Sequence, residues 1–235
     1  MSQEDAIKTH YARFVKRYDE LPHTSARNHA YQYMADYVLS GREDAAVRIL
    51  ELGIGTGYFT RFLVERAPKS HVTGVDISPD MLTKAQINLR PFQKQIQLIC
   101  GAIPAAIPFA AFDVVVSAAA LCFEVIPYDE LFRTVWERLI AGGTFAYMVD
   151  TEMHSPICRQ KRMQMAQPSV PPLTDDQRAF LSWVGRDLDV SVRFYPIEWH
   201  FDRLRRAGFP DADCIYLCHD CTIYAGEKND TRAIS

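Results

Sequence analysis

Three glycines and one acid offer the clearest chemistry in this sequence. Gly53, Gly55 and Gly57 follow an apolar run that ends at Leu52. Glycine has no Cβ atom, so its backbone can take turn conformations closed to other residues and a ligand can approach it closely. Asp76 lies 19 residues after Gly57, near the separation of about 20 residues at which an acid binds ribose hydroxyl groups. This spacing predicts a pocket for a nucleotide-like ligand.

Two predicted strands and one helix would position this pocket. Residues 47–52 form the short apolar run typical of a buried parallel strand. Residues 58–66 carry apolar side chains at helical spacing, and a second apolar strand over residues 71–75 leads into Asp76. Because ligands of open α/β sheets bind just outside the carboxyl ends of the strands, the glycines and the acid should face one site.

The spacing of the glycines separates two kinds of ligand. Dinucleotide-binding enzymes typically carry G-x-G-x-x-G, with the pyrophosphate at the first turn of the following helix. Here Tyr58 occupies the position of the third glycine of that pattern. A nicotinamide-dependent dehydrogenase therefore stays an alternative that the spacing disfavours.

Five segments resemble, in order, those of class I S-adenosylmethionine-dependent methyltransferases: ELGIGTG, the GVD that ends at Asp76, PFAAFDVVVSAA, LIAGGTF, and LRRAGF followed by CTIYAGEK. The resemblance runs from about residue 45 to residue 228. It implies an α/β fold with a Rossmann-like, doubly wound, seven-stranded and mostly parallel sheet whose last strand is antiparallel, in one domain over residues 1–235. It also implies transfer of a methyl group from S-adenosylmethionine to a small-molecule acceptor, with S-adenosylhomocysteine as the product.

The same resemblance assigns residues to the cofactor. Asp76 would hold the ribose, and Ile77 and Met81 would pack against the adenine. The adenine amino group would meet only the backbone of Ala102 and Ile103, since this chain has alanine where many relatives have an acceptor aspartate. The full set expected at the cofactor is Tyr18, Glu51, Gly53, Gly55, Gly57, Asp76, Ile77, Met81, Ala102, Ile103, Ser117 and Ala118.

Residues 1–44 are predicted to form an N-terminal helical lid. Apolar residues recur at helical spacing over residues 3–18, and a second helix follows Ser25. By the resemblance, Tyr18 and the His23–Thr24 corner would close the sulfonium from water. The alternative is that Tyr18 only packs the lid against the sheet.

The fourth strand is predicted over residues 112–117 and the fifth over residues 144–149, and between them a helix begins at Pro127 and is ended by the Gly142–Gly143 pair. The acceptor is expected beyond these two strands. By the resemblance, Cys122 and Phe123 would face the substrate.

Residues 151–173 lack a steady period and are rich in methionine and proline, and a helix is predicted over residues 174–188. We therefore predict a helical insertion after the fifth strand, over residues 151–195, which forms a substrate cap that includes Met153. A packing insertion or a dimer contact is the alternative for this segment.

A sulfonium is already an activated leaving group, so alignment of donor and acceptor is the main requirement for catalysis. An acceptor that carries a proton would also need a base. The candidates are His154, just past the fifth strand, and Glu124, just past the fourth.

Composition and charge argue against several classes of protein. The 235-residue chain has a formal net charge of −3 and no basic run interleaved with aromatic residues, so we expect no nucleic-acid partner. No apolar run approaches the roughly 18 residues of a membrane span, and the start lacks a signal-peptide pattern, so a cytoplasmic protein is expected. The six cysteines suit free thiols in a reducing compartment. Monomer and homodimer both stay open.

Cys214, Cys218, His219 and Cys221 lie close together in sequence and invite a metal interpretation. Zinc sites usually combine two close pairs of ligands from separate turns. A strand of period two would point Cys214 and Cys218 to one face and His219 to the other. We therefore expect no metal.

Two further interpretations keep the same fold. The sequence loosely resembles bacterial enzymes that make carboxy-S-adenosylmethionine for tRNA wobble-uridine modification, and such enzymes place an arginine near the sulfonium to bind a carboxylate. Arg178, Arg186 and Arg193 lie in the corresponding region. The other interpretation is a non-catalytic module that binds S-adenosylmethionine.

Overall fold

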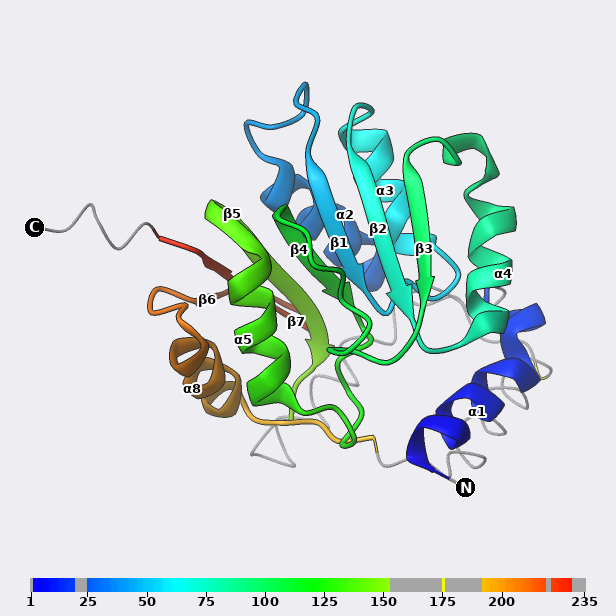
Figure 1. The fold of residues 1–235 in the computed structure, drawn as a ribbon. Coiled ribbons are helices and arrows are strands. Elements are labelled where there is room, and N and C mark those ends of the chain that lie inside the picture. The colour runs from blue at the N-terminus through cyan, green and yellow to red at the C-terminus, as the bar shows by residue number, and fades with distance from the viewer. Residues whose placement is uncertain (1, 20–24, 153–174, 176–191, 219–220, 230–235) are drawn as a thin grey trace, which may run out of the picture.

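A single mixed sheet runs through the molecule. The computed structural model describes residues 2–19, 25–152, 175, 192–218 and 221–229, and within them seven strands form a sheet in the order β3-β2-β1-β4-β5-β7-β6 (Figure 1). Neighbouring strands run parallel except at β7, which is antiparallel to both β5 and β6. The predicted Rossmann-like sheet is confirmed. The strands are β1 (Arg48–Leu52), β2 (His71–Asp76), β3 (Ile96–Cys100), β4 (Phe112–Ala118), β5 (Leu139–Asp150), β6 (Asp213–Cys218) and β7 (Cys221–Glu227).

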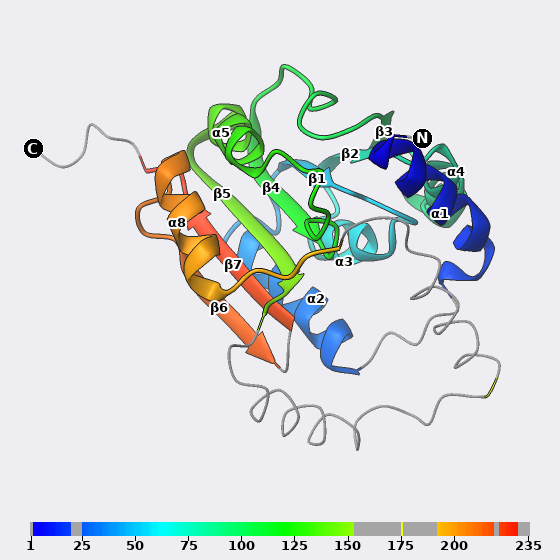
Figure 2. The ribbon, with the colours of Figure 1, turned by 90° about the horizontal axis from the view of Figure 1, so that it is seen from below.

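Helices cover both faces of this sheet. In Figures 1 and 2, α2 and α3 lie on one face, α5 and α8 lie on the other, and α1 lies beyond the carboxyl ends of β2 and β3, next to α4. No helix in the described part of the chain is long and apolar enough to cross a membrane. The helices are α1 (Gln3–Tyr18), α2 (Ser25–Leu39), α3 (Tyr58–Arg66), α4 (Pro79–Asn88), the 3-10 turn η1 (Arg90–Phe92), α5 (Tyr128–Arg138) and α8 (Ile197–Ala207).

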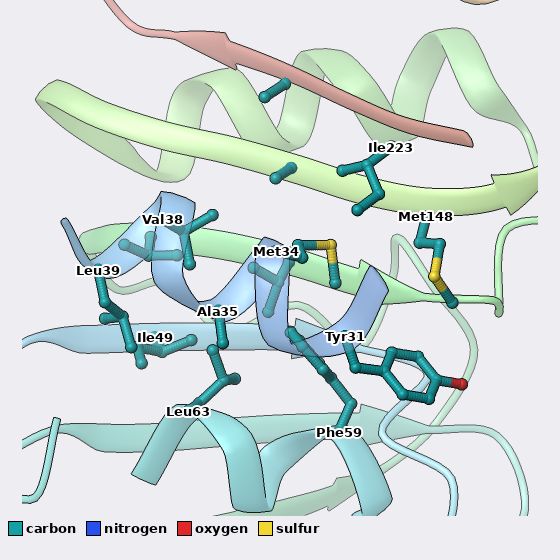
Figure 3. Packing of buried hydrophobic residues seen from close by; sticks show 14 of the residues in the cluster. Tyr31, Met34, Ala35, Val38, Leu39, Ile49, Phe59, Leu63, Met148 and Ile223 are labelled. Atoms are coloured by element: carbon teal, nitrogen blue, oxygen red, sulfur yellow. The ribbon is translucent and has the colours of Figure 1, made fainter. Parts of the chain in front are cut away.

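The apolar run of β1 is buried on both sides because it lies in the middle of the sheet. Successive side chains alternate, so Ile49 joins the core under α2 and α3 while Leu50 joins the core under α5 and α8. Figure 3 shows Met34 and Leu39 of α2 and Leu63 of α3 packed with Ile49. All five side chains are fully buried, which anchors the strand that leads into the glycine turn.

The helices next to the predicted pocket begin and end where local chemistry favours it. Gly57 has a φ of 77° and directly precedes α3. The Ser78 hydroxyl accepts a hydrogen bond from the Met81 amide at 3.3 Å and caps α4. Gly208 has a φ of 112° and ends α8, where a Cβ atom would lie 2.9 Å from the Trp136 ring. The bounds of α3 agree with the helix predicted over residues 58–66.

One predicted boundary is wrong. The Gly142–Gly143 pair was expected to end the helix before the fifth strand, but α5 ends at Arg138 and β5 begins directly at Leu139, whose backbone is extended. Gly142 has a φ of 73°, and its amide donates to the Lys228 carbonyl at 2.8 Å. A left-handed glycine within a paired strand accommodates a local irregularity, and a glycine pair alone does not distinguish this from a helix end.

Candidate cofactor site

The turn after β1 has the left-handed backbone that its glycines allow. Gly53, Gly55 and Gly57 have φ values of 70°, 56° and 77°. The Gly53 amide donates to the Val75 carbonyl at 2.8 Å, so the turn is tied to the end of β2. A Cβ atom at Gly53 would collide with Ala120, whereas one at Gly55 would meet no atom within 4 Å. The turn is therefore tightly packed on one side and open above Gly55.

Asp76 joins this turn to the start of α4. Its Oδ2 atom accepts a hydrogen bond from the Gly55 amide at 2.8 Å, and its Oδ1 atom accepts one from the Ser78 amide at 2.9 Å. Burial raises the pKa of the Asp76 carboxyl, and the two amide donors oppose that rise. A carboxylate has about four acceptor positions, so Asp76 keeps capacity for the hydroxyl groups of a sugar.

A cavity of about 370 Å³ opens above the turn, at the carboxyl ends of β1 to β4. This volume falls in the usual range of small-molecule pockets. Its walls are mostly apolar, with carboxylates at Glu4, Asp76 and Glu130. The lining comes from the turns after β1, β2, β3 and β4 and from one side of α1, so the strands supply the floor and α1 supplies the roof.

The roof carries two tyrosines. Tyr11 and Tyr18 of α1 line the cavity, and their ring centroids lie 6.3 Å apart in an edge-to-face arrangement. Tyr11 makes a second edge contact at 6.3 Å with Phe123, which follows β4. Burial raises the pKa of both tyrosine hydroxyls, so they stay protonated near neutral pH. The roof is thus aromatic and uncharged at these rings.

Most residues expected at the cofactor lie around this one cavity. They come from five separate parts of the chain, which only the folded sheet and α1 bring together. Those that line it are Tyr18, Gly53, Gly55, Asp76, Ile77, Met81, Ala102, Ile103 and Ala118.

Glu51, Gly57 and Ser117 lie behind the lining. The Glu51 carboxylate is buried and accepts a hydrogen bond from the Thr60 hydroxyl at 2.8 Å. Burial raises the pKa of Glu51 to about 8. A Cβ atom at Gly57 would press on Leu89, and the Ser117 hydroxyl donates to the Leu52 carbonyl at 2.8 Å. The structure shows these three residues shaping the turn and strand ends, and their contact with a cofactor stays a prediction.

Of the residues expected to face the acceptor, some line the cavity and others do not. Phe123 lines the cavity. Cys122 is half-buried outside the lining, and burial raises the pKa of its thiol to about 12, so it stays a neutral thiol near pH 7. Met153 lies outside the described residues, as does the His23–Thr24 corner.

The two candidate bases differ in what the structure describes, and only the position of Glu124 is known, outside the lining of the cavity. Glu124 is exposed and forms an ion pair with Arg193 at 3.1 Å. It lines a separate groove of about 530 Å³ beside Tyr195 and Trp199. His154 lies outside the described residues, as do Arg178 and Arg186, so both bases stay predictions.

Several lining residues were not among those expected. Ile7 and Tyr11 of α1 face the cavity, and their helical spacing with Tyr18 is the sequence signal that could have found them. Ala119 also lines it, with a φ of 60° that is uncommon for a residue other than glycine. Nothing in the sequence signals that backbone conformation.

The cysteine-rich end of the chain forms a strand pair. Cys218 lies opposite Cys221 in the register of β6 and β7. Within the described residues, no three His, Cys, Asp or Glu side chains come together in a group that could hold a metal ion. His219 lies outside them.

Known proteins share both the sequence motifs and the fold. Residues 49–143 match the family described as "Methyltransferase domain". A malonyl-[acyl-carrier protein] O-methyltransferase of Bacillus cereus is 33% identical over 124 residues, which cover 51% of this chain and 45% of that protein. A trans-aconitate 2-methyltransferase of Streptomyces avermitilis is 36% identical over 118 residues, which cover 49% of this chain and 43% of that protein. The chain thus spans about half the length of these curated relatives.

A solved structure extends the likeness to nearly the whole chain. The phosphoethanolamine N-methyltransferase 2 of Haemonchus contortus, in complex with phosphomonomethylethanolamine and S-adenosylhomocysteine, superposes with a TM-score of 0.68 at 15% identity. The superposition covers 98% of this chain and 61% of that one, and at this identity it shows a shared fold. Together with the glycine turn, Asp76 and the sheet order, the family match shows a methyltransferase domain over residues 49–143, in a chain with the fold of the class I S-adenosylmethionine-dependent methyltransferases.

Proposed function

We propose that this chain binds S-adenosylmethionine in the cavity and transfers its methyl group to a small-molecule acceptor. The observation that carries the proposal is the joint position of the open Gly55 backbone and the Asp76 carboxylate on the floor of one cavity of about 370 Å³. Asp76 would accept hydrogen bonds from the ribose hydroxyl groups, and Ile77 and Met81 would pack against the adenine. This arrangement fits an adenosyl group.

The bound donor supplies a methyl group attached to a sulfonium sulfur. An acceptor lone pair attacks the methyl carbon in line with the carbon–sulfur bond, and the sulfur departs as a neutral thioether. The residues of this chain then have to align the two groups and exclude water, and such positioning supplies on the order of 7 to 11 kcal/mol in favourable cases. Tyr11 and Tyr18 would cover the donor from α1 with neutral rings, whose faces favour a nearby cation. Neither hydroxyl would ionise near pH 7, because burial raises both pKa values.

The acceptor side of the cavity would lie where Phe123 meets Tyr11. Residues 1–44 would serve as the lid and residues 151–195 as the substrate cap, with His154 and Glu124 as the candidate bases. The relatives include both an O-methyltransferase and an N-methyltransferase, which supports a common donor site with variable acceptor chemistry.

Calorimetric titration with S-adenosylmethionine tests this proposal. We expect the parent to bind and the Asp76→Ala variant to bind at least 100-fold more weakly, because both the ribose contacts and the bond that orients Gly55 are lost. Asp80→Asn is the matched control, since Asp80 is exposed in the first turn of α4 and is outside the cavity lining.

Equal binding by the parent and Asp76→Ala would refute the assignment of Asp76. Mass spectrometry of molecules that copurify with the parent gives an independent reading. S-adenosylmethionine or S-adenosylhomocysteine would support the proposal, whereas a dinucleotide or a carboxylated adduct would replace it with one of the rival interpretations.

A further inference from the structure

Asp19, the residue directly after α1, makes an unusual set of contacts. Asp19 caps the C-terminus of α1 and is about three-quarters buried. Its Oδ1 atom accepts a hydrogen bond from the Thr56 hydroxyl at 2.6 Å, and its Oδ2 atom accepts one from the Asn88 amide at 2.9 Å. The Lys84 ammonium lies 3.6 Å from Oδ2. One carboxylate thus joins α1 to the glycine turn and to α4.

Thr56 makes this contact informative, because it lies between Gly55 and Gly57 in the turn whose Gly55 lines the cavity. Its side chain is almost fully buried. The Asn88 amide that donates to Asp19 also donates to the Thr56 carbonyl at 3.0 Å. Asp19 is therefore bonded to the side chain of the turn and, through Asn88, to its backbone.

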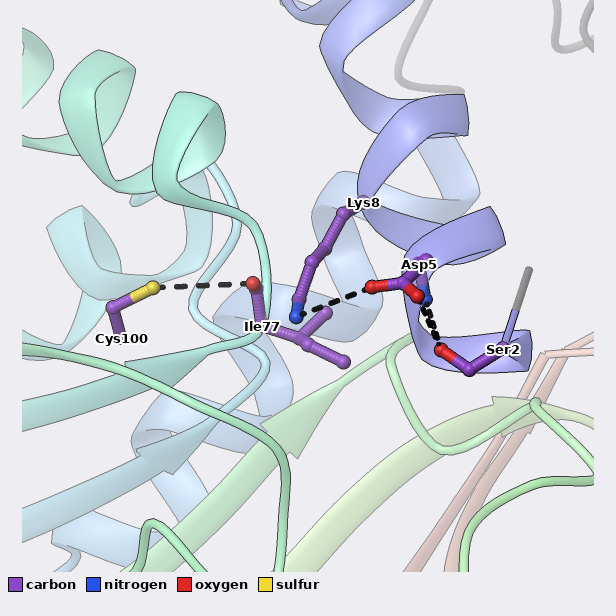
Figure 4. A network of polar contacts seen from close by, with 5 residues as sticks. All are labelled: Ser2, Asp5, Lys8, Ile77 and Cys100. Atoms are coloured by element: carbon purple, nitrogen blue, oxygen red, sulfur yellow. Dashed lines mark hydrogen bonds and ion pairs between the residues drawn. The ribbon is translucent and has the colours of Figure 1, made fainter.

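The other end of α1 differs. Figure 4 shows Ser2, Asp5 and Lys8 paired with one another within the helix. The Asp5 amide donates to the Ser2 hydroxyl oxygen at 3.1 Å, and Lys8 lies 3.9 Å from the Asp5 carboxylate. These bonds stabilise the first turn of α1, while the helix meets the body there through apolar contacts of Ile7.

We propose that Asp19 is a positioning residue that latches α1 over the bound cofactor. The inference rests on the proposed cofactor site. Tyr11 and Tyr18 reach the cavity from α1, and Tyr18 directly precedes Asp19. In this proposal, α1 moves away when a ligand beneath these rings is released, and that movement breaks the bonds of Asp19 to Thr56 and Asn88. Hydrogen bonds to a charged group are among the stronger ones in proteins, so the latch slows release of the cofactor.

The Asp19→Asn variant tests the latch in the full-length chain. Its carboxamide is nearly isosteric but carries no charge and keeps one acceptor oxygen. We expect the dissociation rate of S-adenosylmethionine, measured by rapid mixing with excess S-adenosylhomocysteine, to rise about tenfold, which corresponds to the loss of one charge-assisted hydrogen bond. The dissociation constant should rise by a similar factor.

Thr56 offers a second pair of variants on the other side of the bond. Thr56→Val keeps the shape of the side chain and removes the donor, whereas Thr56→Ser keeps the donor. We expect Thr56→Val to raise the dissociation rate of the cofactor. In Thr56→Ser the rate should stay within about twofold of that of the parent. Asp19→Asn should have a smaller effect in the Thr56→Val background than in the parent, because the two changes remove the same bond.

Asp36→Asn is the matched control for a purely structural role. The Asp36 carboxylate also joins two helices, α2 to α3, through Arg66 at 2.9 Å, but, unlike α1, neither of these helices contributes a residue to the lining of the cavity. We expect Asp36→Asn to leave the dissociation rate of the cofactor unchanged. The melting temperature of the ligand-free protein, measured for every variant, separates loss of stability from faster release.

Two outcomes would overturn the latch, and they are distinguishable. The latch alone would be overturned if the parent binds the cofactor and the cofactor dissociates from Asp19→Asn at the same rate as from Asp36→Asn. A parent that binds neither S-adenosylmethionine nor S-adenosylhomocysteine would overturn the proposed function and the latch with it.

Discussion

The floor and the roof of the cavity are built by different kinds of bonds. The floor is main chain joined to main chain: the Gly53 amide bonds to β2 at 2.8 Å, and the Ala119 amide bonds to the Met148 carbonyl of β5 at 2.9 Å. The roof is α1, which reaches the cavity through the side chains of Tyr11 and Tyr18. A floor made from strand ends cannot shift without disturbing the sheet, whereas a roof held by side chains can move while the sheet stays folded. This difference suits a site that must be rigid where it binds and open where ligands pass.

The comparison predicts that a change in the floor has the largest effect on cofactor binding. In Gly53→Ala the new methyl group would collide with Ala120, in addition to the strain of a φ of 70°. We expect no measurable binding of S-adenosylmethionine by calorimetry and a melting temperature lowered by several degrees.

Gly41→Ala is the control for backbone strain. Gly41 has a φ of 73°, but a Cβ atom there would meet nothing within 4 Å. It should lose only the roughly 1 kcal/mol typical of alanine in a left-handed conformation and should bind the cofactor normally. If both variants behave alike, the close approach at Gly53 is not what shapes the floor.

A change in the roof should have an intermediate effect. Tyr11→Leu removes the edge contacts with Tyr18 and Phe123, and each such aromatic contact contributes about 0.5 to 1.5 kcal/mol beyond its buried area. We expect binding of S-adenosylmethionine about tenfold weaker, with the sheet still folded by circular dichroism.

Tyr11→Phe is the matched variant, because it keeps the ring and removes only the hydroxyl. The affinity of Tyr11→Phe for S-adenosylmethionine should be closer to the parent's affinity than the affinity of Tyr11→Leu is. The opposite order would mean that the hydroxyl of Tyr11, and not its ring, covers the site.

Glu51 should have the smallest effect on cofactor binding and a clear effect on stability. Burial raises the pKa of Glu51 to about 8 in the folded protein, from an ordinary value of 4.5. Between these two pH values the folded chain keeps a proton that the unfolded chain has lost, so the free energy of unfolding falls as pH rises from about 5 to 8. In Glu51→Gln this fall disappears, and the variant should be more stable than the parent at pH 8 by on the order of a few kcal/mol.

Urea unfolding at pH 5, 6.5 and 8 measures this difference. Glu65→Gln is the control, since Glu65 is exposed on α3. Parallel pH profiles for the parent and Glu51→Gln would show that Glu51 ionises normally in the fold. A large loss of cofactor affinity in Glu51→Gln would instead place this carboxyl at the ligand, as the motif predicts.

The sequence revealed the floor better than the roof. Glycine spacing and Asp76 are local signals, because each left-handed turn and each strand end depends on residues that are adjacent in the chain. The contribution of α1 is not local. Ile7 and Tyr11 show only that one face of a helix is apolar, and the partner of that face depends on packing between parts of the chain that are far apart in sequence.

One wrong prediction and one missed feature have the same origin. The Gly142–Gly143 pair was interpreted as a helix end, but pairing of β5 with its neighbours extends the strand back to Leu139. Ala119 gave no signal, although neighbouring strands hold its backbone at a φ of 60°. Tertiary hydrogen bonds override local preference at both places.

The amino-acid sequence by itself determined the apolar strand before the glycine turn, the turn itself and the acid at the end of β2, because these follow from hydrophobic periodicity and from the backbone freedom of glycine. The seven-stranded sheet was implied by the resemblance to class I methyltransferases. Only the tertiary structure decided which side chains of α1 line the cavity and that Asp19 bonds to Thr56 and Asn88. The carboxylate and its partners are separated by 37 and 69 residues, and only the packing of α1 beside α4 brings them within hydrogen-bonding distance.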